Sequence, residues 1–106
     1  MIIAQVEAGI CGFSTLIRVS ILARRSIKFT LESECDHITA LGNHLSTLGI
    51  REVLKTPINQ NPIYETAGRC HLHASCAVPC GVLKAAEIAL GLALPKEVKI
   101  VFQDHS

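Results

Sequence analysis

The first third of the chain alternates apolar and polar residues with a period of two. Residues 17–24 run Ile-Arg-Val-Ser-Ile-Leu-Ala-Arg, and residues 26–32 run Ser-Ile-Lys-Phe-Thr-Leu-Glu. This period places one face of a strand on a core and the other face in water. The pattern predicts two antiparallel strands joined by a turn at residues 23–26, with a further strand over residues 2–6.

The apolar period changes after Ser33. Ser33 and Asp36 have the spacing of a capping box, which marks the start of a helix. Apolar residues then recur at helical spacing, at Ile38, Leu41, Leu45 and Leu48. Gly49 stands where the residue after a helix belongs. We therefore expect a helix of about four turns that has Cys35 in its first turn.

Two more helices and a last strand are expected downstream. Asn61 and Pro62 supply the N-cap and the first residue of a short helix that stops near Gly68. A longer helix is predicted from residue 78 or 79 to residue 92. Its expected inner stripe consists of Leu83, Ala86, Leu90 and Leu94. Apolar alternation over residues 98–102 then predicts a final strand.

This order of elements predicts the α+β class. Strands, then helices, then one strand favour a small antiparallel sheet with about three helices packed on one face. The sheet would consist of the hairpin and the N- and C-terminal strands. A chain of 106 residues has the usual size of one domain, so residues 1–106 are expected to form a single domain.

Composition and charge narrow the range of functions expected for this chain. Ten Lys and Arg against nine Asp and Glu give a formal charge of +1, so no strong field attracts nucleic acid or an anionic membrane. No stretch suits a bilayer span, and the N-terminus lacks the basic start of a secretory signal. We therefore expect a cytoplasmic protein. Apolar residues make up 49% of the chain, and an apolar patch left uncovered by so few charges favours a homodimer.

The five cysteines carry the candidate chemistry. An odd count argues against a complete set of disulfides, and cytoplasmic cysteines stay reduced and more often bind metal or catalyse. Five Cys and His residues lie close together, at Cys70, His71, His73, Cys76 and Cys80. Cys35 and Cys80 fall at predicted helix starts, where backbone N–H groups stabilise a thiolate. Cys11 lies between Gly9 and Gly12, in a loop that can bend tightly.

Three functions remain open from the residues alone. The first is a metal or iron–sulfur protein with clustered thiolate ligands. The second is a sulfur-transfer or redox protein that uses a thiol of lowered pKa at a helix start, Cys35 or Cys80, with His71 or His73 as its base. The third is a structural or interaction domain with buried cysteines, the state expected for Cys70. No catalytic serine, phosphate-loop or dinucleotide motif occurs, so a binding protein takes precedence over an enzyme.

The order of the cysteines resembles that of a known family. A Cys-Gly pair lies before the predicted hairpin at Cys11, a second cysteine heads the next helix at Cys35, and Cys76 precedes a long Ala-rich helix. This arrangement is similar to the IscU/NifU N-terminal iron–sulfur cluster assembly scaffold, over most of residues 9–92. The segment Gly-Val-Leu-Lys-Ala-Ala-Glu at residues 81–87 resembles the final helix of that scaffold.

The resemblance implies a ligand set and a partner. The three thiolates of Cys11, Cys35 and Cys76 would converge at one end of the domain and hold an iron–sulfur cluster or zinc. A protein that donates or accepts the cluster is the implied partner.

The chain also departs from that family. Phe13 stands in place of an Asp, Ser75 stands in place of a His, and the Leu-Pro-Pro-Val-Lys docking motif is absent. Cys80 is an additional cysteine that would complete a closed four-thiolate site. Such a site holds its metal firmly rather than passing it on.

Overall fold

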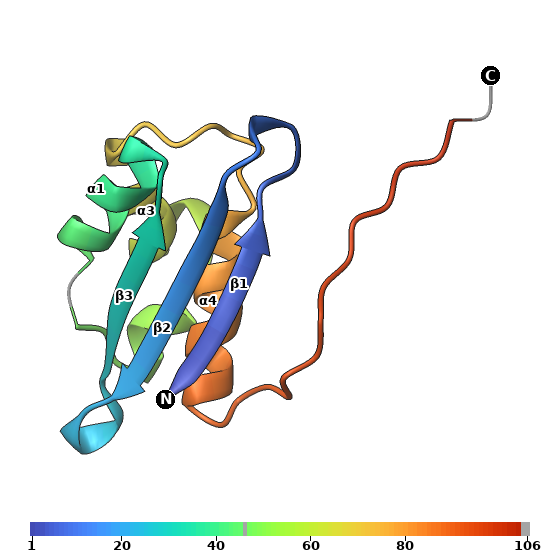
Figure 1. The fold of residues 1–106 in the computed structure, drawn as a ribbon. Coiled ribbons are helices and arrows are strands. Elements are labelled where there is room, and N and C mark those ends of the chain that lie inside the picture. Colours follow the sequence, from blue (N-terminus) through green and yellow to red (C-terminus); the bar gives the residue numbers. More distant parts are fainter. Residues whose placement is uncertain (46, 105–106) are drawn as a thin grey trace.

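The computed structural model describes residues 1–45 and 47–104, with Arg24 described by its backbone alone. Three strands form in that part of the chain: β1 (Ile2–Glu7), β2 (Ser14–Ile21) and β3 (Ile27–Ser33). Four α-helices follow them: α1 (Asp36–His44), α2 (Ile50–Val53), α3 (Pro62–Arg69) and α4 (Val78–Ala89). The chain is an α+β fold, as the order of patterns predicts (Figure 1).

The strands make one antiparallel sheet in the order β1-β2-β3. Its alternation of apolar and polar positions is confirmed. Ile17 and Val19 on β2 are fully buried, whereas Arg18 between them forms an ion pair with Glu32 on β3. A short 3-10 turn, Ala23–Arg25, closes the hairpin where the sequence predicts a turn.

The helices cover one face of the sheet. Helix α4 lies against β1 and β2, α1 lies against β3, and α3 contacts both of these helices (Figure 1). Gly81 allows α4 to approach the sheet, because a Cβ atom there would lie 2.6 Å from Cγ2 of Val6. The start of α4 is thereby fixed beside the end of β1. No helix in the described residues is long and apolar enough to cross a membrane.

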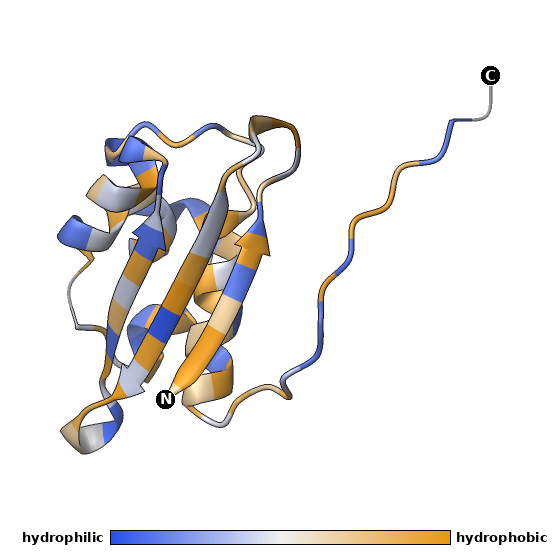
Figure 2. Cartoon of the chain, in the orientation of Figure 1, coloured by the Kyte–Doolittle hydropathy of each residue, from blue (hydrophilic) through white to orange (hydrophobic). Residues whose placement is uncertain are grey.

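An aliphatic core lies between the sheet and the helices. Figure 2 shows apolar positions alternating with polar ones along the strands. The largest fully buried side chains of the core include Ile17, Ile27, Leu41 and Ile63. Full burial of one such side chain contributes roughly 1.5–3 kcal/mol relative to exposure. All five cysteines are free, so burial and hydrogen bonds stabilise the fold without a covalent cross-link.

Helix α1 is shorter than the pattern predicts. It spans Asp36–His44, with Cys35 as its N-cap. Ser33 does not cap the helix, because its Oγ accepts the backbone N–H of Cys35 at 3.1 Å in the turn before it. Leu48 is not helical, because its backbone exchanges two hydrogen bonds with Ile27, of 2.8 and 3.1 Å. The expectation of four turns ending before Gly49 is therefore wrong.

Helix α3 begins where the sequence predicts. Oδ1 of Asn61 accepts the backbone N–H of Ile63 at 3.0 Å, and Pro62 is the first helical residue. The amide Nδ2 of Asn61 donates to the carbonyl oxygen of Val53 at 3.0 Å. One buried side chain thus caps α3 and holds it against the end of α2.

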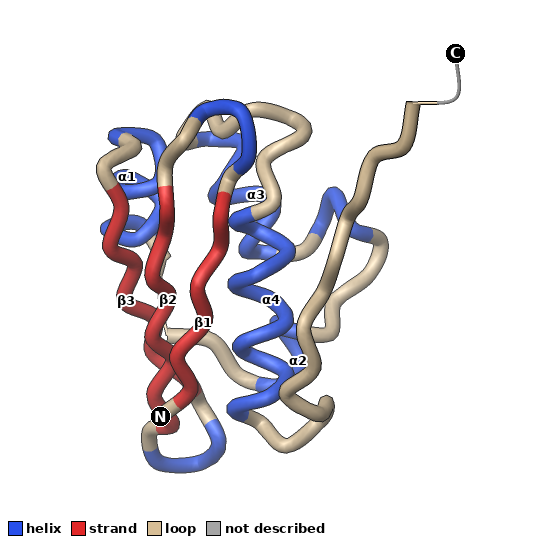
Figure 3. Tube along the Cα trace, turned by 45° about the vertical axis from the view of Figure 1, so that its right-hand side comes forward, coloured by secondary structure: helices blue, strands red, loops and turns tan. Residues whose placement is uncertain are grey.

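The expected C-terminal strand is wrong. Residues 91–104 follow α4 as an extended segment that joins no strand, and the side chains of residues 98–102 are exposed. Gly91, with a φ of +75°, turns the chain at the end of α4 and leads it past the side of that helix that faces away from the strands (Figure 3). Leu94, expected on the inner stripe, is accordingly 80% exposed.

Candidate functional site

All five cysteines lie in segments that meet at one end of the molecule, which we call the thiol end. It comprises the β1–β2 connection, the start of α1, the α3–α4 connection and the first turn of α4 (top of Figure 1). The topology accounts for this gathering. Because β1 and β3 run antiparallel to β2, both strands finish at the end of the sheet where β2 begins. The segments that follow β1 and β3 therefore start at this end.

Cys11 lies on the β1–β2 connection, at the end of the 3-10 turn Gly9–Cys11. Gly9 and Gly12 have φ values of +79° and +76°, which glycine adopts without strain. The N–H of Gly12 donates to the carbonyl oxygen of Gly9 at 2.9 Å. The Cys11 side chain is exposed, so this bend presents an accessible sulfur.

Cys35 is held at the start of α1, where it is the N-cap. Its N–H donates to Oγ of Ser33 at 3.1 Å, and its carbonyl oxygen accepts the N–H of Thr39 at 3.0 Å. The side chain is half-buried and packs against the core. These contacts make Cys35 a firmly placed sulfur at the positive end of the α1 dipole.

Cys76 and Cys80 flank the start of α4. Cys76 is half-buried in the segment before the helix, and its N–H donates to the carbonyl oxygen of His73 at 3.0 Å. Cys80 is exposed in the first turn of α4. Its neighbour Gly81 packs against Val6, so the Cys80 backbone is held beside the end of β1.

Cys70 is the buried member of the set, as expected. It is the C-cap of α3 and belongs to the core. Nδ1 of His37 donates to its carbonyl oxygen at 3.1 Å, and the rings of His37 and His73 have centroids 6.4 Å apart. The first turn of α1 therefore contacts the α3–α4 connection at the thiol end.

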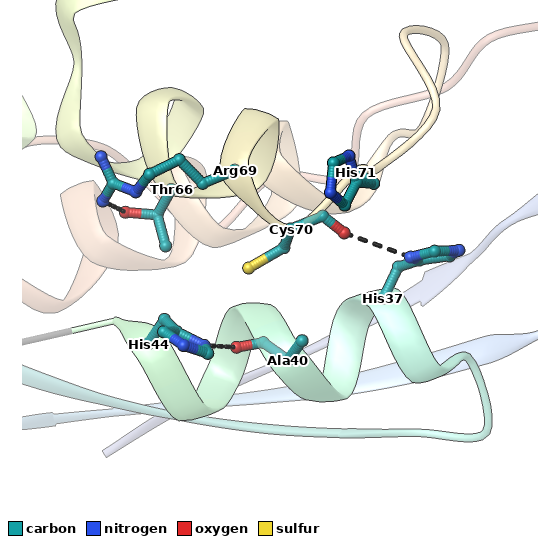
Figure 4. Close-up of a pocket in the computed structure, with 7 residues that line it drawn as sticks. All are labelled: His37, Ala40, His44, Thr66, Arg69, Cys70 and His71. Atoms are coloured by element: carbon teal, nitrogen blue, oxygen red, sulfur yellow. Dashed lines mark hydrogen bonds between the residues drawn. The ribbon is translucent and has the colours of Figure 1, made fainter.

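A cavity of about 380 Å³ opens between α1 and α3 beside the thiol end (Figure 4). Its lining includes His37, His44, Arg69, Cys70 and His71, and none of the described residues that line it is acidic. From the sequence alone, His37 and His44 are expected to be surface residues of a helix. No sequence signal announces this cavity, because it depends on how α1 and α3 pack.

The four predicted metal ligands all lie at the thiol end, but they are not arranged as a preformed metal site. They are Cys11, Cys35, Cys76 and Cys80. Among the described residues, no three His, Cys, Asp or Glu side chains come close enough together to hold one ion. The fold therefore gathers the segments that carry the sulfurs, and the sulfurs would have to close on an ion as it binds.

Tyr64 is a residue near the thiol end that sequence reasoning missed. It is half-buried on α3. Burial raises the pKa of its phenol above the usual value, and the charge of the Cys80 thiolate raises it further. Tyr64 and Cys80 lie on different helices, so only the packing of α3 against α4 reveals this pair.

The fold and the site define a small α+β protein whose free thiols are gathered at one end of an antiparallel sheet. The chain belongs to a family of unknown function, DUF6951, whose sequence profile matches residues 2–102. That range covers the three strands, the four α-helices and most of the extended C-terminal segment. No curated protein and no solved structure matches the chain.

Proposed function

We propose that this chain binds a metal ion or an iron–sulfur cluster through the thiolates of Cys11, Cys35, Cys76 and Cys80. The observation that supports the proposal most is the meeting of the four segments that carry them at one end of the sheet. Four thiolates form the donor set that structural zinc and iron–sulfur clusters use.

The division of the four sulfurs between firm and irregular segments suits a site that closes on binding. Cys35 and Cys80 lie at helix starts, which the core holds in place. Cys11 lies on a glycine bend, and Cys76 lies in the non-helical α3–α4 connection. Binding then draws the two irregular segments toward the two helix starts, so the metal contributes folding free energy to this end of the molecule.

Exposure of two of the thiols bears on how the metal would arrive. Cys11 and Cys80 are exposed, so a second protein that donates or accepts a cluster would reach them directly. The proposal also places the chain in the cytoplasm, where thiols remain reduced and available as ligands.

A thiol carrier or redox protein is the second candidate function. It is favoured by the separation of the thiols, since no three ligand side chains are close together in the described part of the chain. Cys35 is the sulfur best placed for such chemistry, because it is the N-cap of α1 and lies at the positive end of the helix dipole.

Anaerobic reconstitution separates the two candidates. The reduced chain is loaded with ferrous iron and sulfide, or with zinc alone, desalted, and assayed for metal per chain. We expect bound metal that falls by at least half in each of Cys11→Ser, Cys35→Ser and Cys76→Ser. Cys70→Ala is the matched control, because this buried cysteine belongs to the core, and its metal content should equal that of the parent chain.

The other outcomes decide against metal binding. If the chain retains no metal and one cysteine is alkylated much faster than the rest, the thiol carrier is the better account. If no metal is retained and the thiols react slowly in the native chain, both proposals fail and the cysteines are structural.

A further inference from the structure

Strand β1 is an open edge of the sheet. In the described part of the chain it pairs with β2 on one side and with no strand on the other. Natural edges are commonly blocked by Pro, by Lys or by a bulge. The β1 sequence Ile-Ile-Ala-Gln-Val-Glu contains neither residue, and its pairing with β2 runs without a bulge. A row of backbone N–H and C=O groups is therefore open to another strand.

The C-terminal tail, residues 91–104, contains a segment with strand character. Residues 98–102 run Val-Lys-Ile-Val-Phe, which is rich in the β-branched and aromatic residues that favour strands. They are exposed, and Phe102 reaches 89%. A contiguous run of exposed apolar side chains marks an interaction site. Figure 2 shows that the outer part of the tail extends away from the folded body.

The tail is directed away from its own β1. Its first part contacts the outer side of α4, where Lys84, Glu87 and Ile88 line a hollow with Leu94 and Val98. The opposite side of α4 carries the buried residues that face the sheet. Figure 3 shows the tail passing α4 on the side away from the strands. In both views the tail continues away from the strands, and in the described part of the chain it pairs with no strand of its own sheet (Figures 1 and 3).

We propose that residues 98–102 add as a fourth strand to the β1 edge of a second copy of this chain. The second copy returns its own tail to the first, so a symmetric dimer forms and both open edges are paired. Each chain carries one open β1 edge and one segment of strand character that joins no strand of its own sheet, which is the self-complementarity that a two-fold dimer requires. Main-chain hydrogen bonds along the added strand stabilise the pairing.

The side chains favour one antiparallel register. With Lys99 opposite Glu7, the alternation of the strand places Phe102 opposite Ala4, the largest tail side chain beside the smallest on β1. Opposite charges that face each other across a ladder favour pairing, and Glu7 forms no ion pair among the described residues. A parallel register that pairs Val98 with Ile2 would instead place Lys99 opposite Ile3.

Sedimentation equilibrium with reductant and chelator tests the dimer. We expect the full chain to be dimeric and Ile100→Asp to weaken dimerisation at least tenfold, because a carboxylate would enter the added strand. Lys99→Glu should weaken it less, and the exchange Glu7→Lys with Lys99→Glu should restore it. Ile58→Asp is the matched control, since Ile58 is also exposed but lies on the body of the fold.

Zero-length carbodiimide cross-linking between carboxylates and amines tests the partner. Unlabelled and nitrogen-15-labelled chains are refolded together, and the Glu7–Lys99 cross-link is located by mass spectrometry. Links that join a labelled to an unlabelled peptide are expected. Links within one isotope alone would mean that the tail binds its own sheet. That result would overturn the proposal, as would a monomeric parent chain, a dimer unaffected by Ile100→Asp, or a dimer without this link.

Discussion

Nδ1 of His37 donates a hydrogen bond to the backbone carbonyl oxygen of Cys70, 3.1 Å away, and so joins the first turn of α1 to the end of α3. The contact bridges two segments of the thiol end that are far apart in the sequence. It also borders the cavity between the two helices (Figure 4). His44, about two turns further along α1, is hydrogen-bonded within its own helix, to the carbonyl oxygen of Ala40.

His37→Ala should therefore lower the free energy of unfolding by about 1 kcal/mol, the net value of one hydrogen bond. His44→Ala is the control, because its hydrogen bond lies within one helix on an exposed surface, and the change should be smaller. Urea unfolding at pH 7.5 measures both. Equal losses in the two variants would contradict a stabilising contact between α1 and α3.

The approach of α4 to β1 depends on Gly81. A Cβ atom there would lie 2.6 Å from Cγ2 of Val6 and 3.4 Å from Cδ1 of Ile17. Gly81→Ala should lower the free energy of unfolding by roughly 1–3 kcal/mol, the usual cost of overpacking.

Gly68 on α3 provides the matched comparison for Gly81. A Cβ atom at Gly68 would have open space, with nothing within 4 Å. Gly68→Ala should raise stability by up to about 1 kcal/mol, because alanine favours a helix more than glycine. Thermal and urea unfolding of both variants should give opposite signs. Stabilisation by Gly81→Ala would show that α4 stands further from the sheet.

The buried hydroxyl group of Thr15 on β2 lowers the stability of the fold, and a substitution can remove this effect. The Thr15 side chain is fully buried, and its Oγ1 has no hydrogen-bond partner among the described residues. Thr15→Val replaces the hydroxyl by a methyl group of similar shape and should raise the free energy of unfolding by about 1 kcal/mol. Thr30→Val on the exposed face of β3 should change stability by less than about 0.5 kcal/mol. A loss of stability in Thr15→Val would mean that the hydroxyl is satisfied.

Tyr64 reports on the thiolate of Cys80. The chain has one tyrosine and no tryptophan, so ultraviolet titration follows this phenol alone. Burial and then the Cys80 charge raise its pKa. In Cys80→Ala the pKa should fall yet stay above the usual value, because burial remains. Cys11→Ala should leave it unchanged, and equal effects of the two substitutions would contradict the Tyr64–Cys80 proximity.

The raised pKa of Tyr64 also determines how the free energy of unfolding depends on pH. The folded-state pKa of Tyr64 lies above the unfolded value of 10.0. The stability linked to the phenol proton is therefore complete below pH 10, and it is lost as the pH rises through the folded-state pKa. Cys80→Ala should shift this loss to lower pH.

Local patterns predict much of this fold, and tertiary contacts explain where they fail. The strands, the hairpin turn and the Asn61 cap follow from alternation and from residue chemistry within a few positions. The end of α1 does not, because Leu48 pairs with Ile27 on a strand. The alternation over residues 98–102 shows that this segment favours a strand. It does not indicate whether the chain after Gly91 reaches the sheet.

The same division holds for the candidate site. The cysteines follow predicted strands or lie near the starts of predicted helices, as Cys11, Cys35 and the segment from Cys70 to Cys80 show. The topology of the sheet therefore explains why they lie at the same end of the molecule. The distances between the sulfurs, the cavity beside Cys70 and the approach of Tyr64 to Cys80 depend on side-chain packing. No periodicity in the sequence encodes them.

Binding of a metal should also order the thiol end. A ligand that binds only the folded chain stabilises it by about 2.7 kcal/mol at a hundredfold excess over its Kd. The melting temperature of the zinc-loaded chain should therefore rise and return to the starting value with a chelator. Cys35→Ser should abolish this rise, whereas Cys70→Ala should keep it. A rise that survives Cys35→Ser would place the metal elsewhere.

X-ray absorption of the zinc-loaded chain tests the central proposal most directly, because it counts the atoms bound to the metal. Four thiolate ligands predict a shell of sulfur at about 2.3 Å, with one sulfur fewer in Cys80→Ser. A shell made only of nitrogen and oxygen at about 2.0–2.1 Å would contradict the proposal that Cys11, Cys35, Cys76 and Cys80 hold the metal.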